Sequence, residues 1–373
     1  MILSAPMTID IAITNRCNLR CTYCSHFSSP GDVDKELPGK DWMAFFKELN
    51  TYGVMAVSLQ GGEPFIREDL YFIIDAIVSN RMRFNILSNG TLITDKMAAF
   101  ISSTGRCDSV QISIDGSIPT THDSFRGEGN FSMAIQGLQF LKKFNIPTDI
   151  RVTIHRQNVR ELEKIAKLIL EEIGLESFST NAASYMGLCT KNSEMVQLTI
   201  EERCLAMETL LELCRRYPGR INATAGPLAE AKTWTLMNQA RIQGMERFPG
   251  GGFLTGCNGV LNKLAVRADG VLVPCIQMSH IELGRINQDD LREIWQNHKE
   301  LKRMRERNKI PLSDFKNCRG CDYLNYCTGN CPALAYTILG VETHPSPDSC
   351  LRRFLDQGGH LPEKTLLSCF DQQ

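Results

Sequence analysis

Most of the 15 cysteines in this 373-residue chain fall into two groups whose spacing is typical of metal ligands. The first group is Cys17-x-x-x-Cys21-x-x-Cys24, directly after a strand-like stretch at Ile9–Thr14. Such short spacing lets one loop direct several thiolates at one inorganic core. Three thiolates on a four-iron cluster leave one iron open to a small molecule. A zinc site would need a fourth ligand, for which His26 is the local candidate.

The second group lies near the end of the chain and consists of Cys257, Cys275, Cys318, Cys321, Cys327, Cys331 and Cys350. A zinc ribbon uses about four ligands, so seven thiolates are too many for it. They can complete one four-ligand iron–sulfur cluster and most of a second. The remaining cysteines are isolated, and we expect them to be small buried apolar residues: Cys107, Cys189, Cys204, Cys214 and Cys369.

The composition excludes several classes of protein. The 41 basic and 42 acidic residues give a net charge of −1, so the chain has no polycationic surface for nucleic acid or anionic membranes. Its apolar runs are shorter than the roughly 20 residues that span a bilayer, and its first residues lack the features of a signal peptide. We therefore expect a cytoplasmic protein whose cysteines bind metal rather than form disulfides.

Strand-like and helical stretches alternate through the first half of the chain. The strands are expected at Ile9–Thr14, Val54–Gln60, Phe84–Ser88, Val110–Ile114, Ile150–His155 and Phe178–Asn181. The helices between them are expected at Asp41–Tyr52, Asp69–Ser79, Asp95–Ser103, Met133–Phe144 and Val159–Ile173. This alternation favours an α/β fold with a parallel sheet and helices packed outside it. Further helices are expected at Glu201–Arg216, Leu228–Met245 and Leu291–Asn308.

Polar and glycine residues follow several strands, at the edge where parallel α/β sheets carry their sites. Gly61–Gly62–Glu63–Pro64 comes directly after the second strand. Its glycines let the backbone approach a ligand closely, and Glu63 can accept hydrogen bonds from an amino group. Further candidates at or near strand ends are Ser88, Asn89, Ser113, Asp115, Arg126 and Arg151.

Together these motifs resemble those of radical S-adenosylmethionine (SAM) enzymes with a C-terminal SPASM domain. The Cys17 loop is similar to the motif of the first cluster, and the seven later cysteines match the SPASM spacing at every interval. The chain also resembles peptide-modifying maturases, including the SynChlorMet-cassette type. The resemblance implies a partial (β/α)6 barrel at residues 1–198, a helical bridge at 199–253 and a small α+β SPASM domain with two auxiliary clusters at 254–373.

The resemblance implies three [4Fe-4S] clusters and SAM as cofactors. The ligands of the cluster that binds SAM would be Cys17, Cys21 and Cys24. The distal auxiliary cluster would use Cys318, Cys321, Cys327 and Cys350, and the proximal one would use Cys257, Cys275 and Cys331 with an unidentified fourth ligand. The amino group of SAM would bind the segment Gly61, Gly62, Glu63 and Pro64. Its methionyl and ribose groups would contact Ser88, Asn89, Ser113 and Asp115, and its carboxylate would pair with Arg126 or Arg151.

The activity implied is reductive cleavage of SAM to a 5′-deoxyadenosyl radical that abstracts hydrogen from a substrate. Oxidative cross-linking of a ribosomally made precursor peptide is the leading hypothesis, with flavodoxin or ferredoxin as reductant. The first strand begins by about Thr8, so we expect a separate protein, or another surface, to recognise the peptide.

Two other reactions and one class of non-enzyme compete with this hypothesis. They are dehydrogenation of a small alcohol or aminocyclitol, sulfatase-maturase-like oxidation, and a non-enzymatic electron carrier or zinc protein. Sulfatase maturases carry an aspartate after the cysteine equivalent to Cys275, where this chain has Ile276. The sequence identifies no catalytic base.

Overall fold

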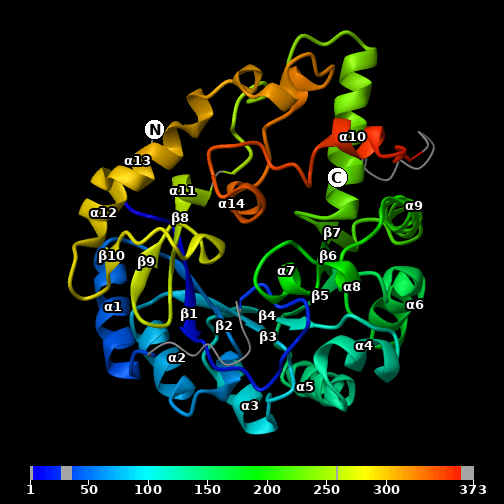
Figure 1. Cartoon of the computed structure of the whole chain (residues 1–373). Coiled ribbons are helices and arrows are strands. Elements are labelled where there is room, and N and C mark those ends of the chain that lie inside the picture. Colours follow the sequence, from blue (N-terminus) through cyan, green and yellow to red (C-terminus); the bar gives the residue numbers. More distant parts are fainter. Residues whose placement is uncertain (1–2, 27–35, 258, 363–373) are drawn as a thin grey trace. The chain divides into compact units, whose positions relative to one another are not determined.

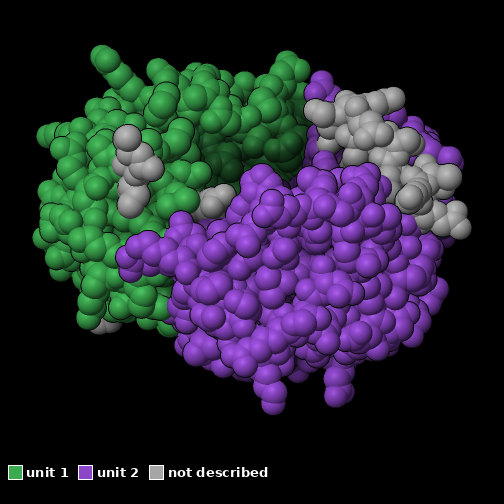
Figure 2. Space-filling model, turned by 90° about the horizontal axis from the view of Figure 1, so that it is seen from above, with its two compact units in different colours: residues 1–114, 122–149, 258–305 green, residues 115–121, 150–257, 306–373 purple. Residues whose placement is uncertain are grey.

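The computed structural model describes residues 3–26, 36–257 and 259–362. The chain forms two compact units that are interleaved along the sequence (Figure 2). The first unit consists of residues 1–114, 122–149 and 258–305, and the second of residues 115–121, 150–257 and 306–373. In the described part of the chain, no helix is long and apolar enough to cross a membrane.

The sheet of the first unit is built from distant parts of the sequence. Four parallel strands follow one another in space, namely β1 (Thr8–Thr14), β2 (Ala56–Gly61), β3 (Arg83–Ser88) and β4 (Cys107–Ser113). On the other side of β1 lie the parallel strand β8 (Lys263–Val266) and then two antiparallel strands, β9 (Val271–Val273) and β10 (Gly284–Arg285). A segment of the last third of the chain therefore completes the sheet beside β1.

Helices connect these strands and cover the sheet. The first unit contains α1 (Gly39–Thr51), α2 (Leu70–Ser79), α3 (Asp95–Ser103), α5 (Asn130–Lys143), α11 (Gly259–Asn262), α12 (Leu291–Asn297) and α13 (Lys299–Arg305). In Figure 1, α1, α2 and α3 lie outside strands β1 to β3. Trp42, Phe45, Phe46 and Leu49 of α1 are fully buried. Their spacing puts them on one face of the helix, which explains why this segment folds as an amphipathic helix.

The second unit repeats the alternation of strands and helices. Its parallel strands are β5 (Thr148–Ile154, of which Ile150 onward belongs to this unit), β6 (Phe178–Ala182) and β7 (Ile221–Ala223). Its helices are α6 (Leu162–Lys167), α7 (Leu188–Lys191), α8 (Ser193–Val196), α9 (Ile200–Arg216), α10 (Pro227–Ile242), α14 (Pro332–Leu339) and α15 (Leu351–Asp356). Helix α4 (Pro119–Arg126) has residues in both units. The predicted α/β fold with a parallel sheet is confirmed.

Several predicted elements differ in detail. The helix expected at Val159–Ile173 is a 3-10 turn, then α6, then a π-helical turn at Leu168–Glu172. The helix expected at Leu291–Asn308 breaks at His298, whose ψ of 128° is extended, and ends in a 3-10 turn. Strand β7 and helix α4 were not predicted as regular elements, and the three residues of β7 are too few to show a period.

The backbones at the ends of β1 and β2 make direct contact. The amide of Gly62 donates to the Thr14 carbonyl at 2.8 Å, and the amide of Glu63 donates to the Arg16 carbonyl at 2.8 Å. A Cβ atom at Gly62 would lie 2.0 Å from the Arg16 carbonyl oxygen, and one at Gly61, whose φ is +132°, would lie 2.1 Å from that of Thr14. Only residues without a side chain allow this approach.

We predict that Gly62→Ala lowers the free energy of unfolding by about 3 kcal/mol, because the new methyl group must displace a backbone carbonyl. Gly53→Ala is the control, since a Cβ there meets no atom within 4 Å and the substitution adds only the backbone strain of a φ of +73°. The control should lose only about 1 kcal/mol. Chemical denaturation of both variants measures the difference. Equal losses would show that the contact does not constrain this end of the sheet.

Candidate functional site

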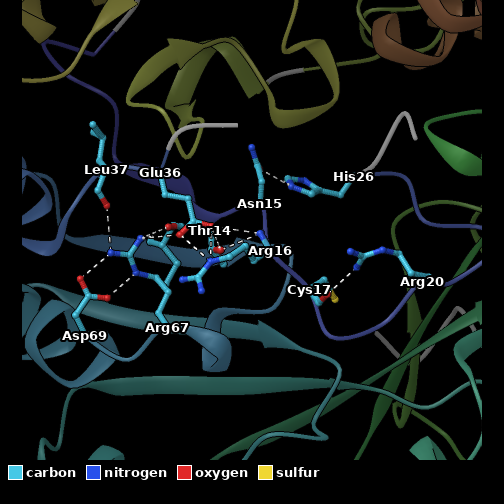
Figure 3. Close-up of polar contacts among 11 residues, drawn as sticks. Thr14, Asn15, Arg16, Cys17, Arg20, His26, Glu36, Leu37, Arg67 and Asp69 are labelled. Carbon is cyan, nitrogen blue, oxygen red and sulfur yellow. Dashed lines mark hydrogen bonds and ion pairs between the residues drawn. The ribbon is translucent and has the colours of Figure 1, made fainter. Parts of the chain in front are cut away.

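A buried arginine fixes the end of β1 just before the first cysteine. Arg67 follows the 3-10 turn η1 (Pro64–Ile66) and is 6% exposed. Its Nη1 donates to the Ile13 carbonyl at 2.6 Å and its Nη2 to the Leu37 carbonyl at 3.1 Å. Asp69 accepts two further bonds from this guanidinium, at 2.8 and 2.7 Å (Figure 3). One side chain therefore joins the end of β1 to the segment that enters α1.

Glu36 extends this network to the residue before the first cysteine. Its carboxylate accepts hydrogen bonds from the Thr14 hydroxyl and from Arg16, whose Nε lies 3.1 and 3.2 Å from its two oxygens (Figure 3). Arg67 lies 3.7 Å from the same carboxylate. Partial burial opposes ionisation, but these hydrogen bonds hold the pKa of Glu36 below its ordinary value. Glu36 is therefore an anion that ties Arg16 to the sheet.

The three cysteines that follow are half-buried free thiols. The Leu19 amide donates to Cys17 Sγ at 3.4 Å, and Asn89 Nδ2 lies 3.9 Å from the same sulfur. Burial, together with the charge of Glu63, raises the pKa of the Cys17 thiol. The positive charge of a metal centre would stabilise the Cys17 thiolate, which burial disfavours. The loop thus fits the cluster that its spacing predicts.

Arg126 brings a positive charge to this loop. Its Nη1 lies 4.0 Å from Cys21 Sγ, and its guanidinium lies 5.5 Å from the centre of the Tyr23 ring. The side chain is 7% exposed. Its charge also favours ionisation of Glu63. The position of Arg126 therefore allows its positive charge to stabilise the thiolates and to pair with an anionic group of a ligand.

Glu63 is completely buried. Its Oε1 accepts from the Ser88 hydroxyl at 2.8 Å and the Phe65 amide at 3.1 Å, and its Oε2 accepts from the Asn89 amide at 2.7 Å. Burial raises the pKa of Glu63 to about 7 in spite of these bonds. Because a carboxylate oxygen can accept about two hydrogen bonds, Oε2 retains capacity for one more donor.

The other predicted SAM contacts fall into two sets. Gly61, Gly62, Pro64, Ser88, Asn89 and Arg126 lie in the first unit with the cysteine loop, as does Ser113 at the end of β4. Asp115 and Arg151 lie in the second unit. Asp115 is buried, and its Oδ1 accepts from the Thr153 amide at 2.7 Å, so part of its carboxylate supports the second unit's own backbone. The predicted roles of these residues in binding SAM remain predictions.

Four cysteines of the C-terminal group line one cavity of about 440 Å³ in the second unit: Cys318, Cys321, Cys327 and Cys350. Burial, and then the negative charges of the other three, raise the pKa of the Cys318 thiol to about 12. The basic side chains that share the lining are Lys316, Arg319, Arg352 and Arg353. Thiols that oppose one another's ionisation need cations to become thiolates, and the irons of a cluster supply them. The donor set fits the predicted distal cluster.

The predicted proximal ligands are divided between the units. Cys257 and Cys331 lie in the second unit, where the charge of Cys257 raises the pKa of the Cys331 thiol further than burial alone. Cys275 follows β9 in the first unit. Two residues later, Gln277 Nε2 donates to the Ser25 hydroxyl at 3.3 Å, next to Cys24. This ligand set remains a prediction, and no fourth ligand is identified.

The isolated cysteines mostly behave as expected. Cys189, Cys204 and Cys214 are buried free thiols, Cys107 is half-buried, and Cys369 lies outside the described residues. Burial raises the pKa of the Cys189 thiol to about 11 although Gln197 donates to it at 3.1 Å. Among the residues that the structure describes, no group of three or more His, Cys, Asp or Glu side chains is placed to hold a single metal ion.

The sequence did not reveal the side chains that hold the loop before Cys350. Arg203 of α9 donates to the Asp348 carbonyl at 3.1 Å and forms a bidentate ion pair with Glu230. Its guanidinium lies 5.1 and 5.8 Å from the centres of the Trp234 and Phe354 rings, which contact each other. Asn330 Nδ2 donates to the next carbonyl, that of Ser349, at 2.7 Å. These contacts join residues that are far apart in the sequence, so no local motif predicts them.

Comparisons with known proteins agree with this arrangement. Residues 11–169 match the model of the Radical SAM superfamily, and residues 257–322 match that of the SPASM iron-sulfur cluster-binding domain. The chain is 27% identical to an AdoMet-dependent heme synthase of Methanosarcina barkeri, over 92% of this chain and 96% of that protein. It is 25% identical to a PqqA peptide cyclase of Ruegeria pomeroyi, over 93% of this chain and 88% of the relative.

A solved structure shares the fold. Streptococcus suis SuiB bound to the precursor peptide SuiA superposes with a TM-score of 0.71 at 16% identity, over 94% of this chain and 77% of that one. At this identity the likeness shows the fold alone.

We predict that Arg203→Met lowers the iron bound after anaerobic reconstitution by about four atoms per chain, because the loop before Cys350 loses its anchor. Glu230 would then be buried without its partner, which can itself unfold the protein. The double variant Arg203→Met/Glu230→Leu removes both charges and should lose the same iron. Arg215→Met, on the exposed face of α9, is the matched control. Full iron content in the folded double variant would show that Arg203 does not position Cys350.

Proposed function

This chain is a radical SAM enzyme with a C-terminal SPASM domain, and we propose that it modifies a ribosomally made precursor peptide by oxidative cross-linking. The observation that carries the proposal is the match with PqqA peptide cyclase over 93% of this chain. The relative is named for action on a peptide. Electrons removed from such a substrate must be transferred to an acceptor. Clusters held by the C-terminal thiols would accept them.

The residues of the first unit support a particular division of labour. Cys17, Cys21 and Cys24 would hold the cluster that binds SAM. When bound, this cluster would supply the electron for reductive cleavage of SAM to the 5′-deoxyadenosyl radical. Glu63 would accept a hydrogen bond from the amino group of SAM at the free position on Oε2. Arg126 would pair with the carboxylate, since it lies at Cys21 and its charge acts on Glu63.

The second unit would hold the auxiliary clusters, for a total of three. The cavity with four thiols and four basic side chains supports the distal one. SAM-dependent radical chemistry also requires a one-electron donor, for which flavodoxin or ferredoxin is suitable. We further propose a cytoplasmic location and a separate peptide-recognition protein. Because the net charge of the chain is close to zero, we propose neither nucleic acid nor a membrane as a partner.

A tetrapyrrole substrate is the strongest alternative. The heme synthase relative is slightly more similar, at 27% identity, and this chain covers 96% of its length. The two hypotheses share the cleavage of SAM and differ in the molecule that loses hydrogen.

The proposed function predicts that the reconstituted protein, given SAM and a reductant, forms 5′-deoxyadenosine. A small peptide encoded next to its gene should then change mass by the loss of two hydrogens per cross-link, measured by mass spectrometry. The variant with Cys17, Cys21 and Cys24 replaced by alanine should form no 5′-deoxyadenosine yet keep the auxiliary iron. Continued cleavage of SAM by this variant would refute the assignment of the first cluster. Conversion of an iron porphyrin, with the peptide unchanged, would favour the tetrapyrrole hypothesis instead.

The raised pKa of Glu63 predicts that SAM binds more tightly as the pH rises from 6 to 8. The ionised carboxylate accepts the hydrogen bond from SAM, and burial raises its pKa to about 7, so most Glu63 is protonated at pH 6 and ionised at pH 8. For one titrating group, the apparent affinity should rise about tenfold across this range. Equilibrium binding of SAM by the reconstituted protein measures it.

Glu63→Gln should bind SAM more weakly and lose this part of the pH dependence. The exposed residue Glu128 provides the control variant Glu128→Gln, which should behave like the parent protein. SAM has an amino group that titrates in the same range, but its contribution is common to all three proteins. Identical pH profiles for the parent and Glu63→Gln would remove Glu63 from the SAM site.

A further inference from the structure

Four exposed basic side chains line the cavity of about 440 Å³ that contains the thiols of the proposed distal cluster. These residues form a basic patch: Lys316, Arg319, Arg352 and Arg353. The four cysteines of the same cavity are half-buried. Among the described residues of the lining, Asp356 is the one acidic side chain. A half-exposed set of metal ligands therefore shares its cavity with an excess of positive charge.

Most of this charge is not neutralised within the protein. Arg352 forms an ion pair with Asp356 at 3.8 Å, and both side chains are largely in water. The guanidinium of Arg319 donates to two backbone carbonyls, at 3.1 and 3.5 Å, and to no carboxylate. In the part of the chain that the structure describes, Lys316 and Arg353 form no ion pair either. Three of the four cations thus face solvent without an acidic partner.

The exposure of the patch indicates what it does. A cluster held by four thiolates would be negative, and cations that served the cluster alone would act most strongly if they were buried against it. All four side chains lie instead at the surface, where water and salt weaken their effect on the interior. Like charges that gather on one exposed surface attract a partner of opposite charge and speed its encounter.

The proposed cross-linking needs a partner that removes an electron. Once a hydrogen atom has been abstracted, formation of the new bond releases one proton and one electron from the substrate. The half-buried thiols would hold the distal cluster close to the surface, which shortens the path to an external acceptor. Complexes that transfer electrons are transient and bury little area, so complementary charge largely determines how fast they form.

We propose that the basic patch docks an acidic one-electron carrier protein of the flavodoxin type, which accepts this electron. The inference rests on the proposed function, which supplies both the cluster and the electron. In the complex the oxidised carrier gains one electron, the reduced cluster loses it, and the proton passes to water. Docking itself requires no peptide, so it can be measured whether or not the chain modifies one.

Isothermal titration of the reconstituted full-length protein with a purified, oxidised flavodoxin tests the proposal. We expect one carrier to bind per chain at low salt and binding to weaken as the salt concentration rises. The double variant Lys316→Gln/Arg353→Gln should bind at least about tenfold more weakly. The double variant Lys316→Arg/Arg353→Lys keeps both charges and should bind as the parent protein does. In stopped-flow experiments, oxidation of the dithionite-reduced protein by flavodoxin should slow by a similar factor in the glutamine variant.

Lys167→Gln is the matched control, because this lysine is exposed on α6 of the same unit and does not line the cavity. It should bind flavodoxin as the parent protein does. Iron analysis and thermal denaturation check that each variant is loaded and folded. Should the double glutamine variant lose iron, the two single variants provide the same comparison.

Three results would each overturn the proposal. They are no binding of flavodoxin at low salt, equal affinity of the parent and the loaded glutamine variant, and equal weakening by Lys167→Gln. A redox titration separates docking from an effect on the cluster, since a reduction potential that shifts while the affinity stays constant also contradicts docking. Unmodified peptide together with normal binding of flavodoxin would instead count against the proposed function.

Discussion

The contact between the backbone after β2 and the backbone at the end of β1 is the constraint on which the candidate SAM site depends. Gly62 and Glu63 donate to carbonyls of Thr14 and Arg16, directly before Cys17. The same hydrogen bonds therefore position both the carboxylate of Glu63 and the start of the cysteine loop. Arg67, three residues after Pro64, secures the arrangement by binding the Ile13 carbonyl from the other side of the turn. A change in either segment must move the other.

The two cysteine sites have a common electrostatic character. Burial raises the pKa values of Cys17 and Cys318, so the protein alone disfavours the thiolates that a cluster requires. Each site partly offsets this cost with arginines, Arg126 near Cys21 and Arg352 near Cys318. The remaining stabilisation has to come from the metal ions themselves. The arginines thus reduce, but do not remove, the cost of ionising the thiols of these two sites, which the nearby carboxylates Glu63 and Asp322 increase.

Residue patterns within short segments of the sequence predicted the features that short segments determine, namely the strands and the cysteine sites. The alternation of apolar residues located the strands β1 to β6 to within about three residues, and cysteine spacing identified both candidate cluster sites. The pattern missed β7, whose three residues are held by pairing with β6 rather than by a period of their own. It also missed Arg67 and Arg203, because each binds carbonyls of segments that only the folded chain brings near. The spacing of residues along the sequence does not indicate such long-range contacts.

The placement of Cys275 shows why the C-terminal cysteines do not form an independent module. The segment that carries it enters the first unit because β8 pairs with β1 over four residues, Thr8 with Lys263 through Ile11 with Val266. Because the entropic cost of closing a loop grows only slowly with its length, such a long-range pairing is compatible with a stable sheet. Residues 257–322 match one domain model, yet they are divided between two structural units. The strand pairing therefore accounts for the placement of Cys275 in the first unit, apart from the other six C-terminal cysteines.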